Sequence, residues 1–230
     1  MKYTMLSPDP DEAHAKVIAL VPGGAHVLEV GAATGYITER LRAHGASVVA
    51  IEPELAAVEA AAARGVEIRH CYVDDLLDDH RGTFDYALVA DVVEHVNNPQ
   101  HFLRTIAELL KPSGKLILSV PNIAHWTARL SVARGRFNYT ERGIFDDTHV
   151  RFYTATTLEA LLDTSGFRVV LKDAALGLFD YPRVPLLMRR IGLHKLIRPA
   201  ARRLAKVRPA LFGYQFIWLA ERSDQAPGRG

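Results

Sequence analysis

The nine residues from Val27 to Gly35, VLEVGAATG, constrain the fold of this chain more than any other stretch. An apolar run of strand length ends at two glycines, Gly31 and Gly35, and a helix is expected directly afterwards, at 36–44. Glycine permits a tight turn and a close approach of the backbone to a ligand, and the first N–H groups of a helix attract anionic groups. Glu29 adds a carboxylate near the end of the strand. The segment is typical of a loop that binds a nucleoside.

Strands and helices alternate through the first 120 residues. The hydrophobic pattern predicts strands at 26–30, 47–51, 66–71, 84–90 and 115–120, and helices at 36–44, 53–64 and 99–110. Nearly continuous apolar runs in the strands indicate a parallel sheet covered by helices on both faces. We therefore expect an α/β fold, a doubly wound, seven-stranded and mostly parallel sheet.

The ends of the chain complete this prediction. An initial helix is expected after Ser7-Pro8-Asp9-Pro10, and the polar turn Pro112-Ser113-Gly114 is expected to precede the fifth strand. Thr156-x-x-Glu159 is read as a capping box that starts a helix ending at Gly166. Two further strands are predicted at 167–171 and 211–220, the last one antiparallel. We expect one domain over 1–223, with a substrate or lid segment at 122–153, and a disordered tail at 224–230.

Composition sets a few limits. The chain has 230 residues, which suits one large α/β domain. No run of about 18 apolar residues is present and the first 20 residues lack a signal-peptide pattern, so we expect a soluble, cytoplasmic protein. Cys71 is the only cysteine, which excludes an internal disulfide and a cysteine-based metal cluster.

A basic block lies at 181–209, within a longer stretch that has no Asp or Glu from Tyr181 to Ala220. Its nine cations, between Arg183 and Arg208, leave 19 basic against 26 acidic residues elsewhere, a net charge of −7. The apolar spacing is helical, and Pro199 is expected to divide the block into two short helices. The block suits an anionic substrate or peripheral contact with a membrane surface. It equally suits a solvated face or the flank of a homodimer; nucleic acid is not favoured, because no recognition motif is present.

The glycine loop distinguishes two cofactor classes. Binding of a dinucleotide through G-x-G-x-x-G would need glycines where the chain has Ala33 and Tyr36. The pattern present, Glu29-x-Gly31-x-Ala33-x-Gly35, resembles the first motif of the class I S-adenosylmethionine-dependent methyltransferases. Only Ala33 departs from the family's usual glycine.

The resemblance continues along the chain, through Glu52 after the second strand, Val73-Asp74-Asp75, Phe84–Val96 and Leu109–Leu116. It implies a Rossmann-like methyltransferase fold with S-adenosyl-L-methionine as cofactor and S-adenosyl-L-homocysteine as product. The implied cofactor residues are Glu29, Gly31, Gly35, Glu52, Asp74, Asp75 and Asp91. The alternatives are that Glu29 is a structural partner of the following helix, that Gly35 is a packing glycine, and that Asp74 and Asp75 belong to an ordinary acidic loop.

Two clusters are candidates for the chemistry. Asp91, Glu94 and His95 lie at the exit of the fourth strand, and the Glu-His pair resembles quinone-biosynthesis O-methyltransferases, where similar residues accompany a divalent cation. Oxygen ligands with an imidazole suit Mg²⁺ or Mn²⁺. The alternative is that Asp91 faces the cofactor while Glu94 caps or pairs locally.

The second cluster is the stretch 145–153, in which His149 is a candidate general base. Together with 121–126 and 135–137 it resembles a branch of the family associated with glycan and polysaccharide assembly, which implies a sugar hydroxyl as acceptor. Glu94 and His95 are the other catalytic candidates. The candidate substrate contacts are Asn122, Trp126, Tyr139, Asp146, Asp147, Arg151 and Tyr153.

The leading hypothesis is an O-methyltransferase for a saccharide, glycolipid precursor or other small molecule, with Mg²⁺ as a candidate cofactor. An N- or C-methyltransferase would share the cofactor site and need no metal. A catalytically silent S-adenosylmethionine-binding partner of a glycosyltransferase is the alternative from a different class.

Overall fold

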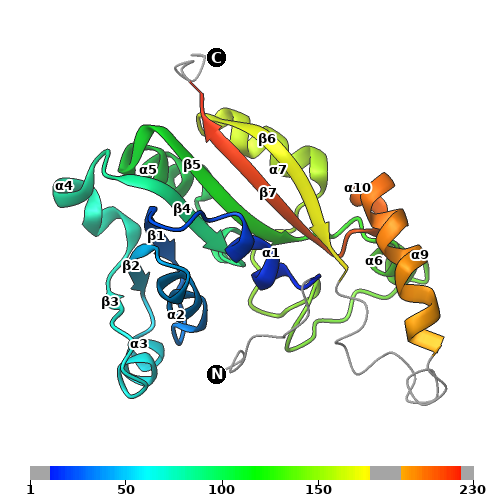
Figure 1. Cartoon of the computed structure of the whole chain (residues 1–230). Helices are drawn as coiled ribbons and strands as arrows, with labels where there is room; N and C mark the ends of the chain where they lie inside the picture. The colour runs from blue at the N-terminus through cyan, green and yellow to red at the C-terminus, as the bar shows by residue number, and fades with distance from the viewer. Residues whose placement is uncertain (1–10, 177–192, 224–230) are drawn as a thin grey trace.

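The computed structural model describes residues 11–176 and 193–223, and it contains one seven-stranded sheet of order β3-β2-β1-β4-β5-β7-β6 (Figure 1). The strands are β1 His26–Val30, β2 Ser47–Glu52, β3 Arg69–His70, β4 Phe84–Ala90, β5 Leu110–Pro121, β6 Phe167–Ala175 and β7 Gln215–Arg222. The strands β1 to β5 pair in parallel, whereas β7 is antiparallel to both β5 and β6. The predicted doubly wound, mostly parallel sheet is confirmed.

Helices cover both faces of this sheet. They are α1 Ala13–Ala19, α2 Tyr36–Ala43, α3 Leu55–Ala62, α4 Leu77–His80, α5 Pro99–Leu109, α6 Trp126–Ala133, α7 Ala155–Thr164, α9 Leu193–Val207 and α10 Pro209–Phe212, with short 3-10 turns η1 Val73–Leu76 and η2 Val93–His95. Leu116 and Leu118 of β5 pack with α5 and α7 in one buried cluster, whereas Ile117 packs with α1 and α2 in another. Because successive strand side chains point to opposite faces, the apolar run of β5 supplies both cores.

Several boundaries differ from the prediction. The strand predicted at 211–220 begins only at Gln215, because Pro209–Phe212 form α10, and the strand predicted at 167–171 continues to Ala175. The strand predicted at 66–71 pairs only at Arg69–His70, because Val66 and Ile68 are buried in a small cluster with Ala61 of α3 instead. Pro112-Ser113-Gly114 lies inside β5, where the register with β4 shifts between Phe84 and Tyr86. The cap of α7 is Thr154, whose side chain bonds reciprocally with Thr157, so Thr156-x-x-Glu159 is not the capping box.

Within the described residues 193–223, the predicted helical basic segment before the last strand is present, but Pro199 does not divide it. α9 runs through Pro199 as one helix, followed by the short α10. Proline removes one backbone hydrogen bond and bends a helix without having to end it. The predicted helix start at 7–10, residues 181–192 of the basic block and the predicted tail at 224–230 lie outside the described residues.

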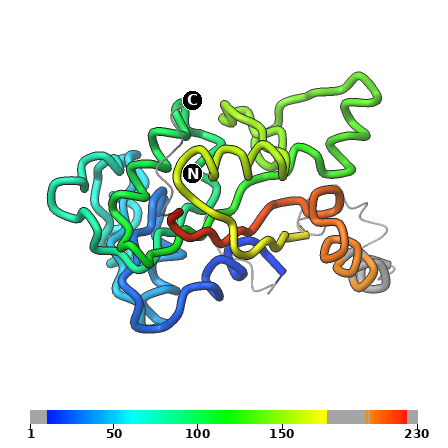
Figure 2. Tube along the Cα trace, turned by 90° about the horizontal axis from the view of Figure 1, so that it is seen from above, coloured from blue at the N-terminus to red at the C-terminus, as the bar shows by residue number. Residues whose placement is uncertain are grey.

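The carboxyl ends of β1, β2, β4 and β5 meet at one edge of the sheet, which the amino end of β7 joins because Pro121 pairs with Gln215. Ligands of open parallel sheets bind at this edge. The segment 122–153 and the helices α9 and α10 gather at the same end of the molecule (Figure 2). Within 11–176 and 193–223, no helix is long and apolar enough to cross a membrane.

Candidate active site

The loop after β1 has the two glycines at backbone angles that favour glycine. Gly31 has φ 74° and Gly35 has φ 81°. A Cβ added to Gly31 would lie 2.5 Å from Val92 Cγ2, and one added to Gly35 would lie 2.6 Å from Val66 Cγ1. The packing role considered for Gly35 is therefore present, and its approach to a cofactor stays a prediction.

Glu52 connects the end of β2 to this loop. One carboxylate oxygen accepts the backbone N–H of Ala33 at 2.9 Å, and the other accepts that of Glu54 at 2.9 Å. Ala33 has φ 48°, in the left-handed region, where a residue with a Cβ is strained and a glycine is not. Because each carboxylate oxygen accepts more than one hydrogen bond, Glu52 keeps capacity for a ribose diol.

Glu29 lies inside the protein instead of at its surface. Its side chain is 3% exposed and accepts a hydrogen bond from the Thr38 hydroxyl at 2.7 Å. Burial raises the pKa of Glu29 to about 7, against the hydrogen bond from Thr38 and the charges of Arg42 and His14, which lower it. Since Thr38 belongs to α2, the alternative of a structural partner for the following helix has direct support, and the cofactor role stays a prediction.

The two acids after β3 are both held by nearby groups. Asp74 Oδ1 accepts the Thr105 hydroxyl at 2.8 Å and lies 3.0 Å from His101 Nε2, so it faces α5. Asp75 accepts the backbone N–H of Tyr72 at 2.8 Å and caps η1. These contacts are those of an ordinary acidic loop, and adenine binding by either side chain stays a prediction.

Asp91 follows β4 with φ 56° and is fixed from three directions. Its Oδ1 accepts the Ser119 hydroxyl at 2.9 Å and the Gln215 side-chain amide. Its Oδ2 lies 3.7 Å from His14 Nε2 of α1. Burial lowers the pKa of His14, but the hydrogen bond and charge of Asp91 outweigh burial and raise it above its ordinary value. Asp91 is thus a fixed carboxylate at the centre of the edge.

Beside Asp91, three side chains form a second centre. One ligand atom from each of Glu94, His95 and His149 lies within 4.8 Å of the others. Glu94 is 1% exposed, and neither of its carboxylate oxygens has a hydrogen-bond partner among the described residues. Burial, followed by the negative charge of Asp91, raises the pKa of Glu94 well above its ordinary value. A buried carboxylate without partners is costly, which is expected of a group that binds a ligand.

In both imidazoles of this centre, Nδ1 faces a backbone carbonyl oxygen. Nδ1 of His95 lies 3.1 Å from the carbonyl oxygen of Thr148, and Nδ1 of His149 lies 3.2 Å from that of Ile144. A carbonyl oxygen only accepts, so each Nδ1 carries the proton and each neutral ring keeps a lone pair on Nε2. His149 Nε2 lies 4.0 Å from Glu94 Oε1. Burial and the charge of His95 lower the pKa of His149, which favours the neutral ring.

This donor set suits a divalent cation, and it differs from the predicted one. The prediction joined Asp91 to Glu94 and His95, but His149 takes the third place in the group that the structure brings together. Hydrogen bonds from Ser119 and Gln215 turn the carboxylate of Asp91 toward β5 and β7. Two imidazoles with backbone-fixed tautomers and one carboxylate form a common metal-binding set.

Backbone hydrogen bonds fix the lid segment to the turn after β4. The N–H groups of Val150 and Arg151 both donate to the Glu94 carbonyl, at 3.0 and 3.1 Å, and the Arg151 guanidinium donates to the Asn97 carbonyl at 2.7 Å. Asp146 is buried and accepts both the N–H and the hydroxyl of Thr148. Arg151 and Asp146 therefore shape the lid that carries His149. Asp146 is buried, whereas Arg151 is exposed and its predicted substrate contact stays a prediction.

The other predicted substrate residues fall into two groups. Asn122 is fully buried. Its side-chain amide donates to the carbonyls of Ala210 and Gly213, and its side-chain oxygen accepts the N–H of Ala124. Asn122 therefore connects the end of β5 to α10, and its side chain has no free group for an acceptor. Exposed near the lid are Trp126, Tyr139 and Asp147. Tyr153 is buried with a hydroxyl that has no partner among the described residues, and burial raises its pKa to about 12.

Four residues of the site were not predicted from the sequence: His14, Thr38, Ser119 and Gln215. Thr38 is the third residue of the helix expected at 36–44, which follows the strand that carries Glu29, so the sequence pattern could have indicated this contact. Gln215 meets Asp91 across 124 residues, and no local signal pointed to that contact.

A doubly wound sheet with a glycine turn after its first strand and a carboxylate after its second defines a nucleoside-cofactor domain. The profile of a family described as a methyltransferase domain matches residues 9–172, more than two thirds of the chain. The chain belongs to this family, and its fold is that of the class I S-adenosylmethionine-dependent methyltransferases.

Relatives and solved structures agree with this assignment. The mitochondrial ubiquinone biosynthesis O-methyltransferase of Rattus norvegicus is 30% identical over 158 residues, 64% of this chain and 45% of the relative. A ubiquinone biosynthesis O-methyltransferase of Xanthomonas axonopodis pv. citri is 40% identical over 109 residues, 45% of this chain and 46% of the relative. The chain thus spans about half the length of the curated relatives it matches.

The structural neighbours show the fold alone. A SAM-dependent methyltransferase from Archaeoglobus fulgidus superposes with a TM-score of 0.61 at 16% identity, covering 90% of each chain. The 1,6-didemethyltoxoflavin-N1-methyltransferase of Burkholderia thailandensis, which holds S-adenosylhomocysteine, superposes with a TM-score of 0.59 at 20% identity, covering 93% of this chain and 80% of that chain.

Proposed function

We propose that this protein transfers a methyl group from S-adenosylmethionine to a hydroxyl oxygen, and that His149 accepts the hydroxyl proton. The observation that carries the proposal is the centre formed by Glu94, His95 and His149 beside Asp91 at the cofactor edge of the sheet. The matched ubiquinone biosynthesis O-methyltransferases support oxygen as the accepting atom.

On the cofactor side, Glu52 is proposed to accept the ribose hydroxyls while the Gly31–Gly35 loop passes close to the nucleoside. When bound, S-adenosylmethionine supplies an electrophilic methyl group on a sulfonium, which becomes a neutral thioether on transfer. Asp91, fixed by Ser119 and Gln215, places a negative charge where it stabilises that cation. Alignment of the acceptor oxygen about 3 Å from the methyl carbon is then the main requirement for rate.

On the acceptor side, His149 has the protonation state that a base needs. Its Nδ1–H is held by the Ile144 carbonyl and its Nε2 lone pair faces Glu94. The new bond joins the acceptor oxygen to the methyl carbon, and the hydroxyl proton moves to Nε2. The negative charges of Asp146 and Asp91, which raise the pKa of His149, then stabilise the imidazolium.

The same donors also fit a divalent cation, which would bind to Glu94, His95 and His149. Such an ion would lower the pKa of an acceptor hydroxyl and remove the need for a protein base. The metal form and the base form use the same His149 Nε2, so they are exclusive. A chelator separates them, because only the metal form loses activity.

Of the two acceptor classes, the relatives favour a phenol-like hydroxyl of a quinone precursor over the sugar hydroxyl predicted from the sequence. The sugar alternative rests on the exposed rings of Trp126, Phe137 and Tyr139 near the lid, which are available for stacking.

A labelled-methyl transfer assay over a panel of phenols, catechols, glycans and amines, with and without Mg²⁺ and chelator, tests the proposal. We expect incorporation into oxygen of at least one phenol. Label only on nitrogen or carbon acceptors would overturn O-methyl transfer. Tight binding of S-adenosylhomocysteine without transfer to any acceptor would favour the silent binding partner.

A further inference from the structure

The segment between α3 and β3 packs against the Gly31–Gly35 loop. A Cβ added to Gly35 would lie 2.6 Å from Val66 Cγ1 and 3.3 Å from Ile68 Cδ1. Val66 and Ile68 are buried in one small cluster with Ala32 of the loop. The shape of the loop therefore depends on a segment that follows β2 and α3 in the sequence.

Arg64, in the same segment, adds polar contacts to this packing. Its Nη1 donates to the carbonyl oxygen of Thr34 at 2.7 Å, across 30 residues of sequence. Its Nη2 pairs with the carboxylate of Glu39 in α2, and its guanidinium carbon lies 3.7 Å from the centre of the Tyr36 ring. A guanidinium is planar and carries several N–H donors, so it can stack on a ring and bind two acceptors at once. One side chain thus contacts both the loop and the first turn of the following helix.

The first half of the loop is fixed from another direction. The N–H groups of Gly31 and Ala32 both donate to the carbonyl oxygen of Ile51 in β2, at 3.0 Å. Thr34 comes later in the loop, and its carbonyl oxygen is held by Arg64. Contacts with β2 at one end and with Arg64 at the other therefore define the backbone between them.

We propose that Arg64 is a positioning residue for the cofactor, and that it acts by holding the Thr34 carbonyl in place. The Gly31–Gly35 loop then has its binding shape before the cofactor arrives, which lowers the free-energy cost of ordering it on binding. This inference rests on the proposed function, since it assigns a support to the same cofactor loop. Arg64 acts through the loop and does not contact the reacting atoms.

Calorimetric titration of the full chain with S-adenosylhomocysteine tests the proposal. We expect R64Q to raise the dissociation constant about tenfold, because it removes a charged hydrogen bond that holds the loop. R64K keeps the charge but lacks the planar fork, so its dissociation constant should lie between those of the wild-type chain and R64Q. An unchanged dissociation constant in R64Q, or in R64K where R64Q does not fold, overturns the proposal.

The first control is E39Q, which removes the ion pair of Arg64 and leaves its contact with Thr34. The side chains of Arg64 and Glu39 are 30% and 42% exposed, and exposed ion pairs contribute little. We therefore expect E39Q to bind S-adenosylhomocysteine within about twofold of the wild-type chain. An equal loss in E39Q and R64Q would assign the effect to the ion pair and overturn the role of the Thr34 contact.

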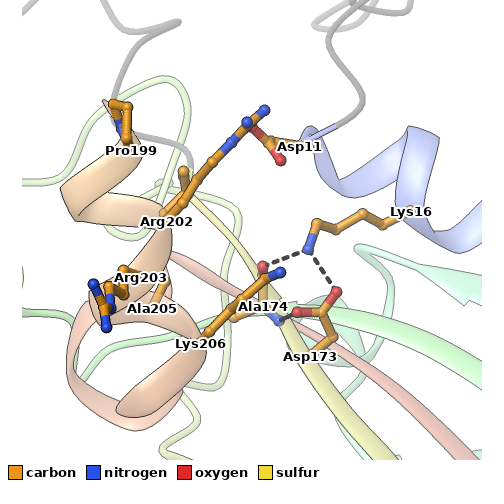
Figure 3. Close-up of a pocket in the computed structure, with 10 residues that line it drawn as sticks. Asp11, Lys16, Asp173, Ala174, Pro199, Arg202, Arg203, Ala205 and Lys206 are labelled. Carbon is orange, nitrogen blue, oxygen red and sulfur yellow. Dashed lines mark hydrogen bonds and ion pairs between the residues drawn. The ribbon is translucent and has the colours of Figure 1, made fainter. Parts of the chain in front are cut away.

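The second control is R202Q, which removes an arginine ion pair far from the loop. Arg202 of α9 pairs with Asp11 at the pocket that α1, β6 and α9 enclose (Figure 3). α9 and α3 lie at opposite ends of the molecule (Figure 1). R202Q should leave the affinity for S-adenosylhomocysteine unchanged. A loss equal to that of R64Q would reveal a general effect of losing an arginine and would contradict the assignment.

Steady-state kinetics with an acceptor found in the transfer assay distinguish positioning of the cofactor from a general structural role. R64Q should raise the KM for S-adenosylmethionine about tenfold and leave kcat and the KM for the acceptor within about twofold. A fall in kcat with an unchanged KM for S-adenosylmethionine contradicts the proposal. Failure of the wild-type chain to bind S-adenosylhomocysteine removes the proposed function itself, whereas binding that R64Q leaves unchanged removes this inference alone.

Discussion

The cofactor half and the acceptor half of the proposed active site differ in how far apart in the sequence their contacting residues lie. The cofactor half, around the loops after β1 and β2, is made by contacts within 30 residues, such as Ala33 with Glu52 and Thr38 with Glu29. The acceptor half is made across the chain, since Thr148 meets His95 over 53 residues and Arg151 meets Asn97 over 54. The cofactor half therefore depends on local backbone geometry, and the acceptor half depends on the whole fold.

This difference predicts that the two halves can be damaged separately. A change in the local loop should alter affinity for the cofactor, and a change in the lid should alter turnover. Any variant that moves both quantities together would argue against two separable halves.

The largest effect is expected for H149N. Loss of the base should lower kcat by about 10²- to 10⁴-fold while the dissociation constant of S-adenosylhomocysteine stays within about twofold. Single-turnover rates and calorimetry measure the two quantities, with H44N, an exposed histidine on α2's C-terminal side, as control. An unchanged rate would remove His149 from the chemistry.

A large effect on stability is expected for E29Q. The pKa of Glu29 is about 7 in the folded protein and ordinarily 4.5, so its protonated form is favoured by folding. The contribution of this proton to the free energy of unfolding is complete below pH 4.5 and is lost as the pH rises to about 7, a change of about 3 kcal/mol. In denaturant unfolding, E29Q should therefore lack this loss of stability. It should be more stable than the wild-type protein at pH 8.

The same variant separates the two roles considered for Glu29. Since a glutamine oxygen still accepts the Thr38 hydroxyl, a purely structural role predicts unchanged binding of S-adenosylhomocysteine. Weaker binding by E29Q would place the carboxylate in contact with the cofactor, and equal pH profiles for the two proteins would contradict the raised pKa.

A smaller effect is expected for E52Q. Replacing the carboxylate weakens its charged hydrogen bonds to the Ala33 N–H and to the proposed ribose hydroxyls, so the dissociation constant of S-adenosylhomocysteine should rise about 10- to 100-fold. E54Q, two residues on and exposed, is the control. Retained affinity in E52Q would show that the ribose lies elsewhere.

The smallest effect is expected for A33G. Relief of the left-handed strain at φ 48° is worth about 1 kcal/mol, and the added freedom of the unfolded chain offsets part of it. The net gain should be about 0.5 kcal/mol in denaturant unfolding. Destabilisation by A33G would mean that the Ala33 conformation is not strained.

The same division explains what could be predicted from the sequence. Apolar runs predicted β1 and β4 to the residue, and the resemblance of Glu29-x-Gly31-x-Ala33-x-Gly35 to a family motif indicated the cofactor class, because both signals are local. Two other features depend on tertiary contacts, which a local sequence pattern does not report. They are the packing of Val66 and Ile68 against α3 and the presence of His149, instead of Asp91, beside Glu94. Asn122 and Asp146 were read as substrate contacts because they are polar residues near the edge, and only burial shows that backbone groups already use them.

A crystal structure with bound S-adenosylhomocysteine tests the central claim most directly. The account predicts ribose hydroxyls hydrogen-bonded to Glu52 and a sulfur atom facing the centre of Glu94, His95 and His149, past Asp91. A nucleoside bound away from Glu52, or a sulfur turned away from that centre, would contradict it.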